Sequence, residues 1–324
     1  MLADYHIHTE LCQHAEGEAS AFRARAVELG LPELCFTDHA PNPDGYDPVN
    51  RMHLDQFPLY RTMIADLART RQPWSPPRSA ARLSSPKSGA LRGGESAPPA
   101  FAEALRAGRP EAGKPVVLFG VEADYYDGCE RFLQDWLPHQ EFDLVLGSVH
   151  YIANWGFDNP DERHVWDSVD VTNTWATYFN LIGKLADSRL TGRRLADGRL
   201  ADGRLADVVG HLDLPKKFGY RPSDRDLREM AQPVLDRIAA AGMAIEINSS
   251  GLRRPVHEIY PSALLLSLAK ERDIPICFGS DAHRPEEVGW QFDASLALAR
   301  SAGYTHAVQY RRRQCRPYAL PTTK

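Results

Sequence analysis

The sequence predicts an α/β fold in which parallel strands, covered by helices, can form a barrel. Seven short apolar runs alternate with longer segments of helical periodicity, and repeated strand-then-helix units indicate parallel strands. Each apolar run ends, at its C-terminal side, in a His, Asp, Glu or Asn. In a barrel of parallel strands these ends converge on one mouth, where active sites are built.

The predicted elements follow one another with few interruptions. The strands are expected at residues 3–8, 33–37, 116–121, 142–148, 206–211, 243–248 and 274–280. The helices are expected at residues 18–30, 54–71, 131–137, 174–187, 223–241, 262–272 and 285–302. Ser223 precedes an acidic first turn, and Gly30 and Gly242 follow a last turn, which are typical start and stop signals of helices.

Two segments break this pattern. Residues from about 73 to 114 are rich in Pro, Ser, Ala, Gly and Arg, a composition that buries too little apolar surface to offset its ordering entropy. Residues 185–207 repeat units similar to LADGR, with leucines spaced by five. A period of five matches neither a helix nor a strand. Both segments are interpreted as low-complexity insertions in loops.

Length, charge and cysteine content limit the classes of protein to which the chain can belong. The chain has 324 residues and a formal net charge of -5, which fits one large barrel or two domains and argues against a general nucleic-acid binder. The run Arg311, Arg312, Arg313 is interpreted as a solvated tail. Five widely spaced cysteines fit a reducing compartment, so a cytoplasmic location is expected. We expect neither a signal peptide nor a transmembrane helix.

The polar residues at the strand ends form a set of metal-ligand types. His6 and His8 alternate at the end of the first apolar run, so both imidazoles face one side of a strand. The candidate ligands are nine: His6, His8, His14, His39, Glu122, His150, His211, Asp281 and His283. Nine are too many for one ion, which favours two or three ions with Glu122 bridging. Cys12, close to His14, is a weaker candidate.

The ligand types also indicate which metals and which chemistry to expect. Imidazoles mixed with carboxylates suit Zn, Mn or Fe, whereas an all-oxygen set would suggest Mg or Ca. Paired metal ions lower the pKa of a shared water towards ~7 and clamp a phosphoryl oxygen. The sequence therefore predicts hydrolysis of a phosphoester.

The ordered motifs resemble a known family. The series HIHTELCQH, FTDH, GVEADY, GSVHY, GHLDL, EINSSGLRRP and GSDAH is similar to the polymerase-and-histidinol-phosphatase (PHP) superfamily, and most of all to its histidinol-phosphate phosphatases. The resemblance runs from residue 3 to about residue 300, outside the two insertions. It implies a single domain over 1–324, a distorted (β/α)7 barrel similar to a TIM barrel, with the metal site at the C-terminal mouth of its strands.

The resemblance also implies how three metals would share the ligands. By motif position, one metal takes His6, His8, Glu122 and Asp281, a second takes Glu122, His150 and His211, and a third takes His14, His39 and His283. Within that assignment, Asp281 or His283 would deliver a proton to the leaving alkoxide. Arg253 would bind phosphate, with Arg254 and Lys216 as alternatives. The residues expected to orient the ligands are Asp4, Asp38, Asp213 and Asn248.

The activity implied by the resemblance is hydrolysis of L-histidinol phosphate to L-histidinol and phosphate in histidine biosynthesis. A substrate with an imidazole and an amine needs an aromatic wall and an acidic group, for which Tyr125, Tyr151 and Asp158 are candidates. One alternative is a PHP phosphoesterase acting on nucleotides or other small phosphomonoesters. Another is a catalytically silent metal-binding regulatory module, which would have lost ligands, and none is lost. The oligomeric state stays open.

Overall fold

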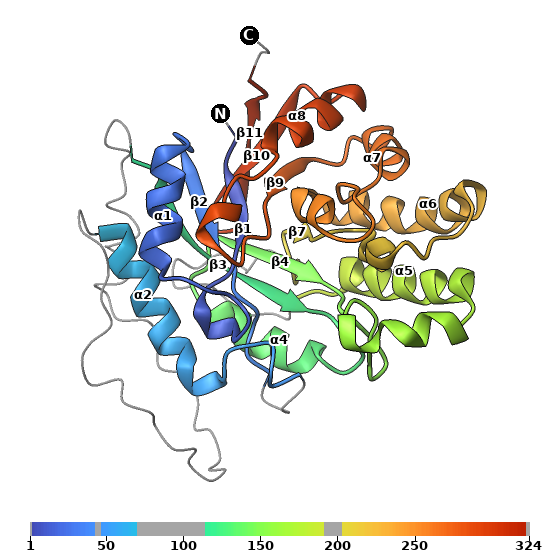
Figure 1. Cartoon of the computed structure of the whole chain (residues 1–324), viewed down its shortest axis with the longest axis horizontal. Coiled ribbons are helices and arrows are strands. Elements are labelled where there is room, and N and C mark those ends of the chain that lie inside the picture. The colour runs from blue at the N-terminus through green and yellow to red at the C-terminus, as the bar shows by residue number, and fades with distance from the viewer. Residues whose placement is uncertain (1, 43–46, 70–113, 191–202, 322–324) are drawn as a thin grey trace.

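Seven parallel strands form the centre of the molecule (Figure 1). The computed structural model describes residues 2–42, 47–69, 114–190 and 203–321. Neighbouring strands lie in the order β1-β2-β3-β4-β7-β8-β9, and each neighbouring pair is parallel. Their bounds are β1 Asp4–Ile7, β2 Glu33–Phe36, β3 Val116–Asp124, β4 Leu144–Ser148, β7 Val208–Val209, β8 Ala244–Asn248 and β9 Ile276–Gly279.

The barrel closes between its first and last strands by few bonds. Near the mouth, the amide of His8 donates to the carbonyl of Ala282 over 2.9 Å, and the amide of Ala282 donates to the carbonyl of His6 over 3.2 Å. Deeper in the barrel, the Asp4 carboxylate accepts from the amide of Ser280 over 2.9 Å. The predicted distorted, TIM-like barrel is therefore confirmed. The side chain of Asp4 replaces backbone bonds over part of the contact between β1 and β9.

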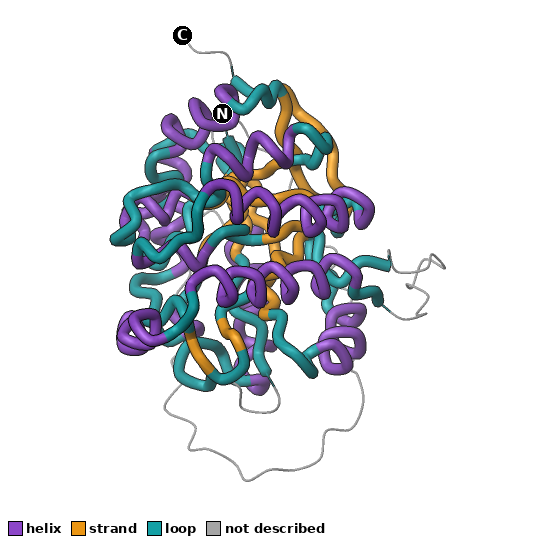
Figure 2. Tube along the Cα trace, turned by 90° about the vertical axis from the view of Figure 1, so that its right-hand side faces the viewer, coloured by secondary structure: helices purple, strands orange, loops and turns teal. Residues whose placement is uncertain are grey.

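Helices surround the strands (Figure 2). Their bounds are α1 Ala19–Glu28, α2 Phe57–Arg69, α4 Glu130–Trp136, α5 Val171–Asp187, α6 Asp224–Ala241, α7 Ala263–Lys270 and α8 Phe292–Ser301. The predicted start and stop signals of helices are confirmed. The Ser223 side chain accepts from the amide of Asp226 at the start of α6, and Gly242 ends that helix with a φ of 65°, a conformation that suits glycine.

Two short hairpins were not predicted. The strands β5 Tyr151–Ile152 and β6 Trp155–Gly156 pair after β4, and a 3₁₀ helix, Pro160–Ser168, comes after them. The strands β10 His306–Arg311 and β11 Gln314–Ala319 pair near the end of the chain. Neither hairpin has an Asn-Gly or Asp-Gly turn between two long alternating runs, which is the pattern that predicts a hairpin.

The predicted insertions fall mostly outside the described residues. All but residue 114 of the first insertion lies outside them, and so do residues 191–202 of the second. At the flanks of the second, Leu185 belongs to α5, and Leu190 and Leu205 are buried. Nothing in the described parts of the chain resembles a membrane-spanning helix in both length and hydropathy.

The arginines of the hairpin β10–β11 correct one prediction. Arg311 forms a two-bond ion pair with the buried carboxylate of Glu33, over 2.6 and 3.1 Å. The amide of Arg312 donates to Asp143 over 3.0 Å, and the Arg313 guanidinium donates to Asp207. These carboxylates lie at or just before the N-terminal ends of β2, β4 and β7. The interpretation as a solvated tail was wrong for Arg311 and Arg313, whose side chains pair with carboxylates beside distant strands, whereas the side chain of Arg312 is exposed.

We expect Arg313→Ala to lower the free energy of unfolding by about 3 kcal/mol, because the buried carboxylate of Asp207 loses its hydrogen-bonded guanidinium. Of the described cations, only the guanidinium of Arg204, 3.9 Å away, would stay close to it. Asp207 is 1% exposed, so water cannot replace the lost guanidinium fully. Urea unfolding measures the change. Arg316→Ala, at an exposed position of β11, is the matched control, and an equal loss in both variants would contradict the role of the ion pair.

Candidate metal centre

The predicted ligands lie at the C-terminal ends of the strands, in line with the residues whose side chains point into the barrel. Apolar side chains of alternate residues fill the inside of the barrel, among them Cys35, Leu118 and Cys277. Counting onward in steps of two from these residues leads to His39, Glu122 and Asp281, because side chains on one face of a strand repeat every second residue. The strand register thus carries the polar residues to the mouth of the barrel.

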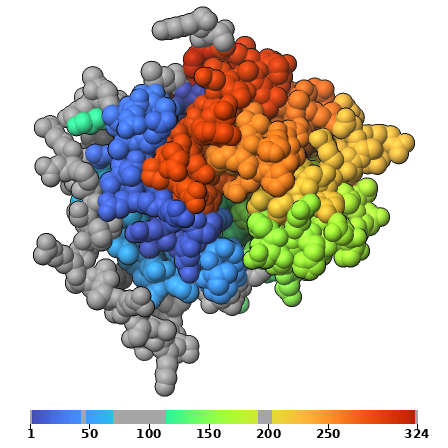
Figure 3. All heavy atoms as spheres, viewed as in Figure 1, coloured from blue at the N-terminus to red at the C-terminus, as the bar shows by residue number. Residues whose placement is uncertain are grey.

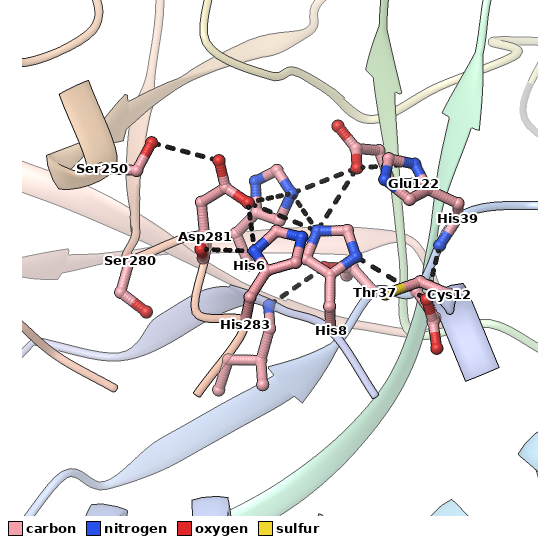
Figure 4. Close-up of polar contacts among 12 residues, drawn as sticks. His6, His8, Cys12, Thr37, His39, Glu122, Ser250, Ser280, Asp281 and His283 are labelled. Carbon is pink, nitrogen blue, oxygen red and sulfur yellow. Dashed lines mark hydrogen bonds and ion pairs between the residues drawn. The ribbon is translucent and has the colours of Figure 1, made fainter. Parts of the chain in front are cut away.

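The first group of donors gathers around His6 and His8 (Figure 4). Their Nε2 atoms lie 3.1 Å apart. The Oε2 atom of Glu122 lies 3.3 Å from His6 Nε2 and 3.5 Å from His8 Nε2. The Oδ1 atom of Asp281 lies 3.7 and 3.4 Å from the same two nitrogens. Four donors from three distant parts of the chain therefore face one point.

The second group shares Glu122 with the first. Its other oxygen, Oε1, lies 3.1 Å from Nε2 of His211 and 3.6 Å from Nε2 of His150. The two imidazole nitrogens lie 3.3 Å apart. Since the two oxygens of Glu122 face different groups, this carboxylate is placed to bridge.

The third group is less regular. The Nε2 atoms of His14 and His283 lie 2.9 Å apart, and donors of His8, His39 and His283 lie within 4.8 Å of one another. The Nδ1 atom of His39, however, faces Glu122 at 3.1 Å. The thiol of Cys12 lies within 4.8 Å of donors of His14 and His283, so this weaker candidate is also at the site.

The spacing of the first two groups fits divalent metal ions. A tetrahedron with metal–ligand bonds of about 2.0–2.1 Å has edges of about 3.3 Å. The donor separations, 3.1 to 3.7 Å, scatter around that value. When the proton of an imidazole is on Nδ1, as the bond of His6 Nδ1 to Glu246 indicates, its Nε2 carries a lone pair. Two such lone pairs that face each other repel, whereas a shared cation binds both.

The far nitrogens of several imidazoles are held by acceptors, as in metal sites. Nδ1 of His6 faces Glu246 Oε1 at 2.7 Å, and Nδ1 of His150 bonds to Asp124. Nδ1 of His14 faces the carbonyl of Cys12 at 2.8 Å. With Nδ1 donating, Nε2 carries the lone pair towards the centre. Glu246 and Asp124 were not predicted to orient the ligands, although each lies two residues from another inward-facing polar residue, Asn248 and Glu122.

The four residues expected to orient the ligands act in different ways. Asp38 lies 3.6 Å from His8 Nδ1, as expected. The side chain of Asn248 donates to Glu246 over 3.0 Å, and Glu246 in turn contacts His6. Asp4 accepts from Ser280 and closes the barrel. Asp213 pairs with Lys216 over 3.0 Å. The sequence identifies these residues as buried and polar, but their partners depend on the turns that come after each strand.

Electrostatics divides the imidazoles into two classes. Burial lowers the pKa of His14, His39 and His283, which favours the neutral form that binds metals. Burial also acts on His6 and His8, but neighbouring carboxylates outweigh it and raise the pKa of both. In the first class, the neighbouring imidazole of His8 lowers the pKa further.

The groups open into a cavity of about 500 Å³, at a hollow where the N-terminal, middle and C-terminal segments meet (Figure 3). Arg254 and Lys217 line it, as do His283 and Asp281. Arg253 does not. Its guanidinium donates to the carbonyls of Ser280 and Asp281 over 2.9 and 3.1 Å.

Arg253 contacts the loop that carries Asp281, and its expected role in binding phosphate stays a prediction. The 3₁₀ helix Ser249–Arg253 after β8 turns this side chain back towards β9, so it supports the Asp281 loop. Arg254 is the neighbouring arginine at the cavity wall. Lys216 is 1% exposed and is tied to Asp213.

Known proteins match this chain over most of its length. The model of the PHP domain matches residues 4–250, and the model named PHP-associated matches residues 264–290. The chain is 35% identical to "Probable histidinol-phosphatase" of Deinococcus radiodurans, over 98% of this chain and 99% of that protein. It is 25% identical to "Histidinol-phosphatase" of Bacillus subtilis, over 90% of this chain and 97% of that protein.

A solved structure has the same fold. Histidinol phosphate phosphatase of Lactococcus lactis, complexed with Zn, L-histidinol and phosphate, superposes with a TM-score of 0.70 at 18% identity, covering 97% of this chain and 98% of that one. The match to the PHP domain spans most of the chain, and the relative from D. radiodurans spans nearly all of it. The chain belongs to the PHP family, in the group of the histidinol-phosphatases.

Proposed function

We propose that the protein is a metal-dependent phosphomonoester hydrolase that converts L-histidinol phosphate and water into L-histidinol and phosphate, in histidine biosynthesis. The observation that carries the proposal is the pair of donor groups that share Glu122 at the mouth of the barrel. The names of the relatives from D. radiodurans and B. subtilis support the substrate. Five free cysteines and a biosynthetic role favour the cytoplasm.

We assign the metals as the motif positions suggest. His6, His8, Glu122 and Asp281 would hold one ion, Glu122, His150 and His211 a second, and His14, His39 and His283 a third. Zn, Mn and Fe all suit these ligands, and Zn is the ion in the L. lactis structure. Bound there, the ions would supply Lewis acidity and an activated water.

The chain's own residues would bind and orient the substrate. Arg254, at the cavity wall, is our candidate for a two-bond contact to phosphate. Arg253 would hold the backbone of Ser280 and Asp281 in place. Asp281 and His283 both line the cavity and are the candidates to give a proton to the leaving alkoxide.

The substrate is tested by phosphate release from a panel of L-histidinol phosphate, nucleoside monophosphates and sugar phosphates, with metal analysis of the same sample. We expect kcat/KM for L-histidinol phosphate to exceed the others by at least roughly tenfold, or ~1.4 kcal/mol. A preference for nucleotides would instead support the broader PHP phosphoesterase activity.

Glu122→Ala is expected to abolish turnover and to lower the metal content, because two donor groups lose their common carboxylate. The measurements are phosphate release and elemental analysis of the purified variant. Glu271→Ala, at an exposed position, is the control and should keep both values. Normal activity in the Glu122 variant would contradict the proposed metal cluster.

Chelation should remove activity and lower the melting temperature, since ions that bind only the folded chain stabilise it by mass action. Adding Zn, Mn or Fe to the chelated protein should restore both, and the order of recovery identifies the preferred ion. Full activity in a sample shown to be free of these metals would contradict a metal-dependent reaction.

A further inference from the structure

The substrate we propose carries a primary amine, which is an ammonium ion at neutral pH. This inference rests on the proposed function. A cavity that holds metal ions repels an ammonium ion unless a carboxylate lies beside it. Among the residues that the structure describes, the carboxylates that line the cavity are Asp47, Glu122, Asp158, Asp281 and Glu287.

Four of these carboxylates already have partners at both oxygens. Glu122 and Asp281 belong to the donor groups described above. Asp47 accepts from Asn50 over 2.6 Å and from Arg51 over 2.9 Å, one at each oxygen.

Both carboxylate oxygens of Glu287 also have partners. Its Oε2 accepts from the amide of His283 over 2.9 Å, and its Oε1 lies 3.4 Å from Nε of Arg253. An ammonium ion would have to displace a partner at each of these four side chains.

Asp158 differs from them. Its Oδ2 accepts from Nζ of Lys217 over 2.9 Å, and within the described ranges its Oδ1 has no partner. Its side chain is 20% exposed at the cavity. Burial raises the pKa of Asp158, but Lys217, His150 and His211 outweigh it and lower the pKa, which favours the charged carboxylate.

The loop around Asp158 is held firmly. Nε1 of the buried Trp166 donates to the carbonyl of Phe157 over 2.7 Å, and the amide of Asn159 donates to the carbonyl of Gly156 over 2.9 Å. The residues on both sides of Asp158 are therefore fixed, which positions an acceptor without further ordering.

We propose that Oδ1 of Asp158 accepts a hydrogen bond from the ammonium group of the substrate, so that Asp158 selects phosphate esters that carry an amine. Lys217 holds the carboxylate through its other oxygen. Asp158 was one of three substrate contacts expected from the sequence. Tyr151 also lines the cavity, whereas the hydroxyl of Tyr125 bonds to Glu130.

The test compares two esters with Asp158→Asn, which keeps the shape of the side chain and an oxygen for Lys217. The esters are L-histidinol phosphate and its analogue without the amine, 3-(imidazol-4-yl)propyl phosphate. The wild type should prefer the amine by about 10- to 100-fold in kcat/KM, as for a hydrogen bond to a charged group. In the variant the preference should fall to within about threefold, through a higher KM for the amine ester alone.

Product inhibition supplies a second readout. Asp158→Asn should weaken inhibition by L-histidinol about tenfold or more and leave inhibition by inorganic phosphate unchanged. Asp167→Asn removes the same charge from an exposed position of the same segment and should behave as the wild type. Equal losses with both esters in the Asp158 variant would overturn the inference, because they would indicate a role in the loop alone.

The two proposals fail in different ways. A wild type that hydrolyses both esters equally well keeps the proposed function and overturns the role of Asp158. A wild type that hydrolyses neither overturns the proposed function. In that case calorimetry with L-histidinol, on the metal-loaded wild type and variant, still decides whether Asp158 binds the ammonium.

Discussion

The structure depends on one constraint, the burial of many ionisable groups at the mouth of a barrel. Glu122 is 1% exposed and His6 is 0% exposed, and burying such groups is costly unless each has a partner. Acceptors satisfy the far side of several imidazoles, as Glu246 does for His6. The Nε2 atoms of these imidazoles face one another and the carboxylate of Glu122, and the distances between these donor atoms suit divalent cations. Much of the surrounding loop structure serves to hold these donors.

The two ends of the barrel solve the problem of buried charge differently. At the mouth, donors converge with their lone pairs inward, which suits a bound cation. At the opposite end, Glu33 and Asp207 are neutralised by arginines of the chain itself. The chemistry is thus confined to one end and the other contributes stability, the division expected of parallel barrels. Apolar side chains such as Leu146 fill the space between them.

The sequence predicts the parts of this arrangement that depend on local periodicity. Strand ends and inward-facing donors such as Glu122 could be placed because an apolar run with a period of two fixes the face of each residue. The turns after the strands were harder to place. Whether Arg253 or Arg254 faces the cavity depends on the residue at which a 3₁₀ helix ends. Arg313 binds Asp207, which lies more than a hundred residues earlier in the sequence. Such contacts depend on the whole fold, so composition alone suggested a solvated run.

The hairpin β10–β11 has a consequence for how the chain acquires its fold. It comes after all seven barrel strands in the sequence, yet it supplies partners to carboxylates of β2 and to Asp143 and Asp207 beside β4 and β7. Because a ribosome releases the chain from its N-terminus onward, the barrel strands emerge before the groups that neutralise their lower ends. A nascent chain that lacks the hairpin therefore also lacks the arginine partners of Glu33 and Asp207, so the lower end of the barrel gains its last ion pairs only when the C-terminal segment has emerged.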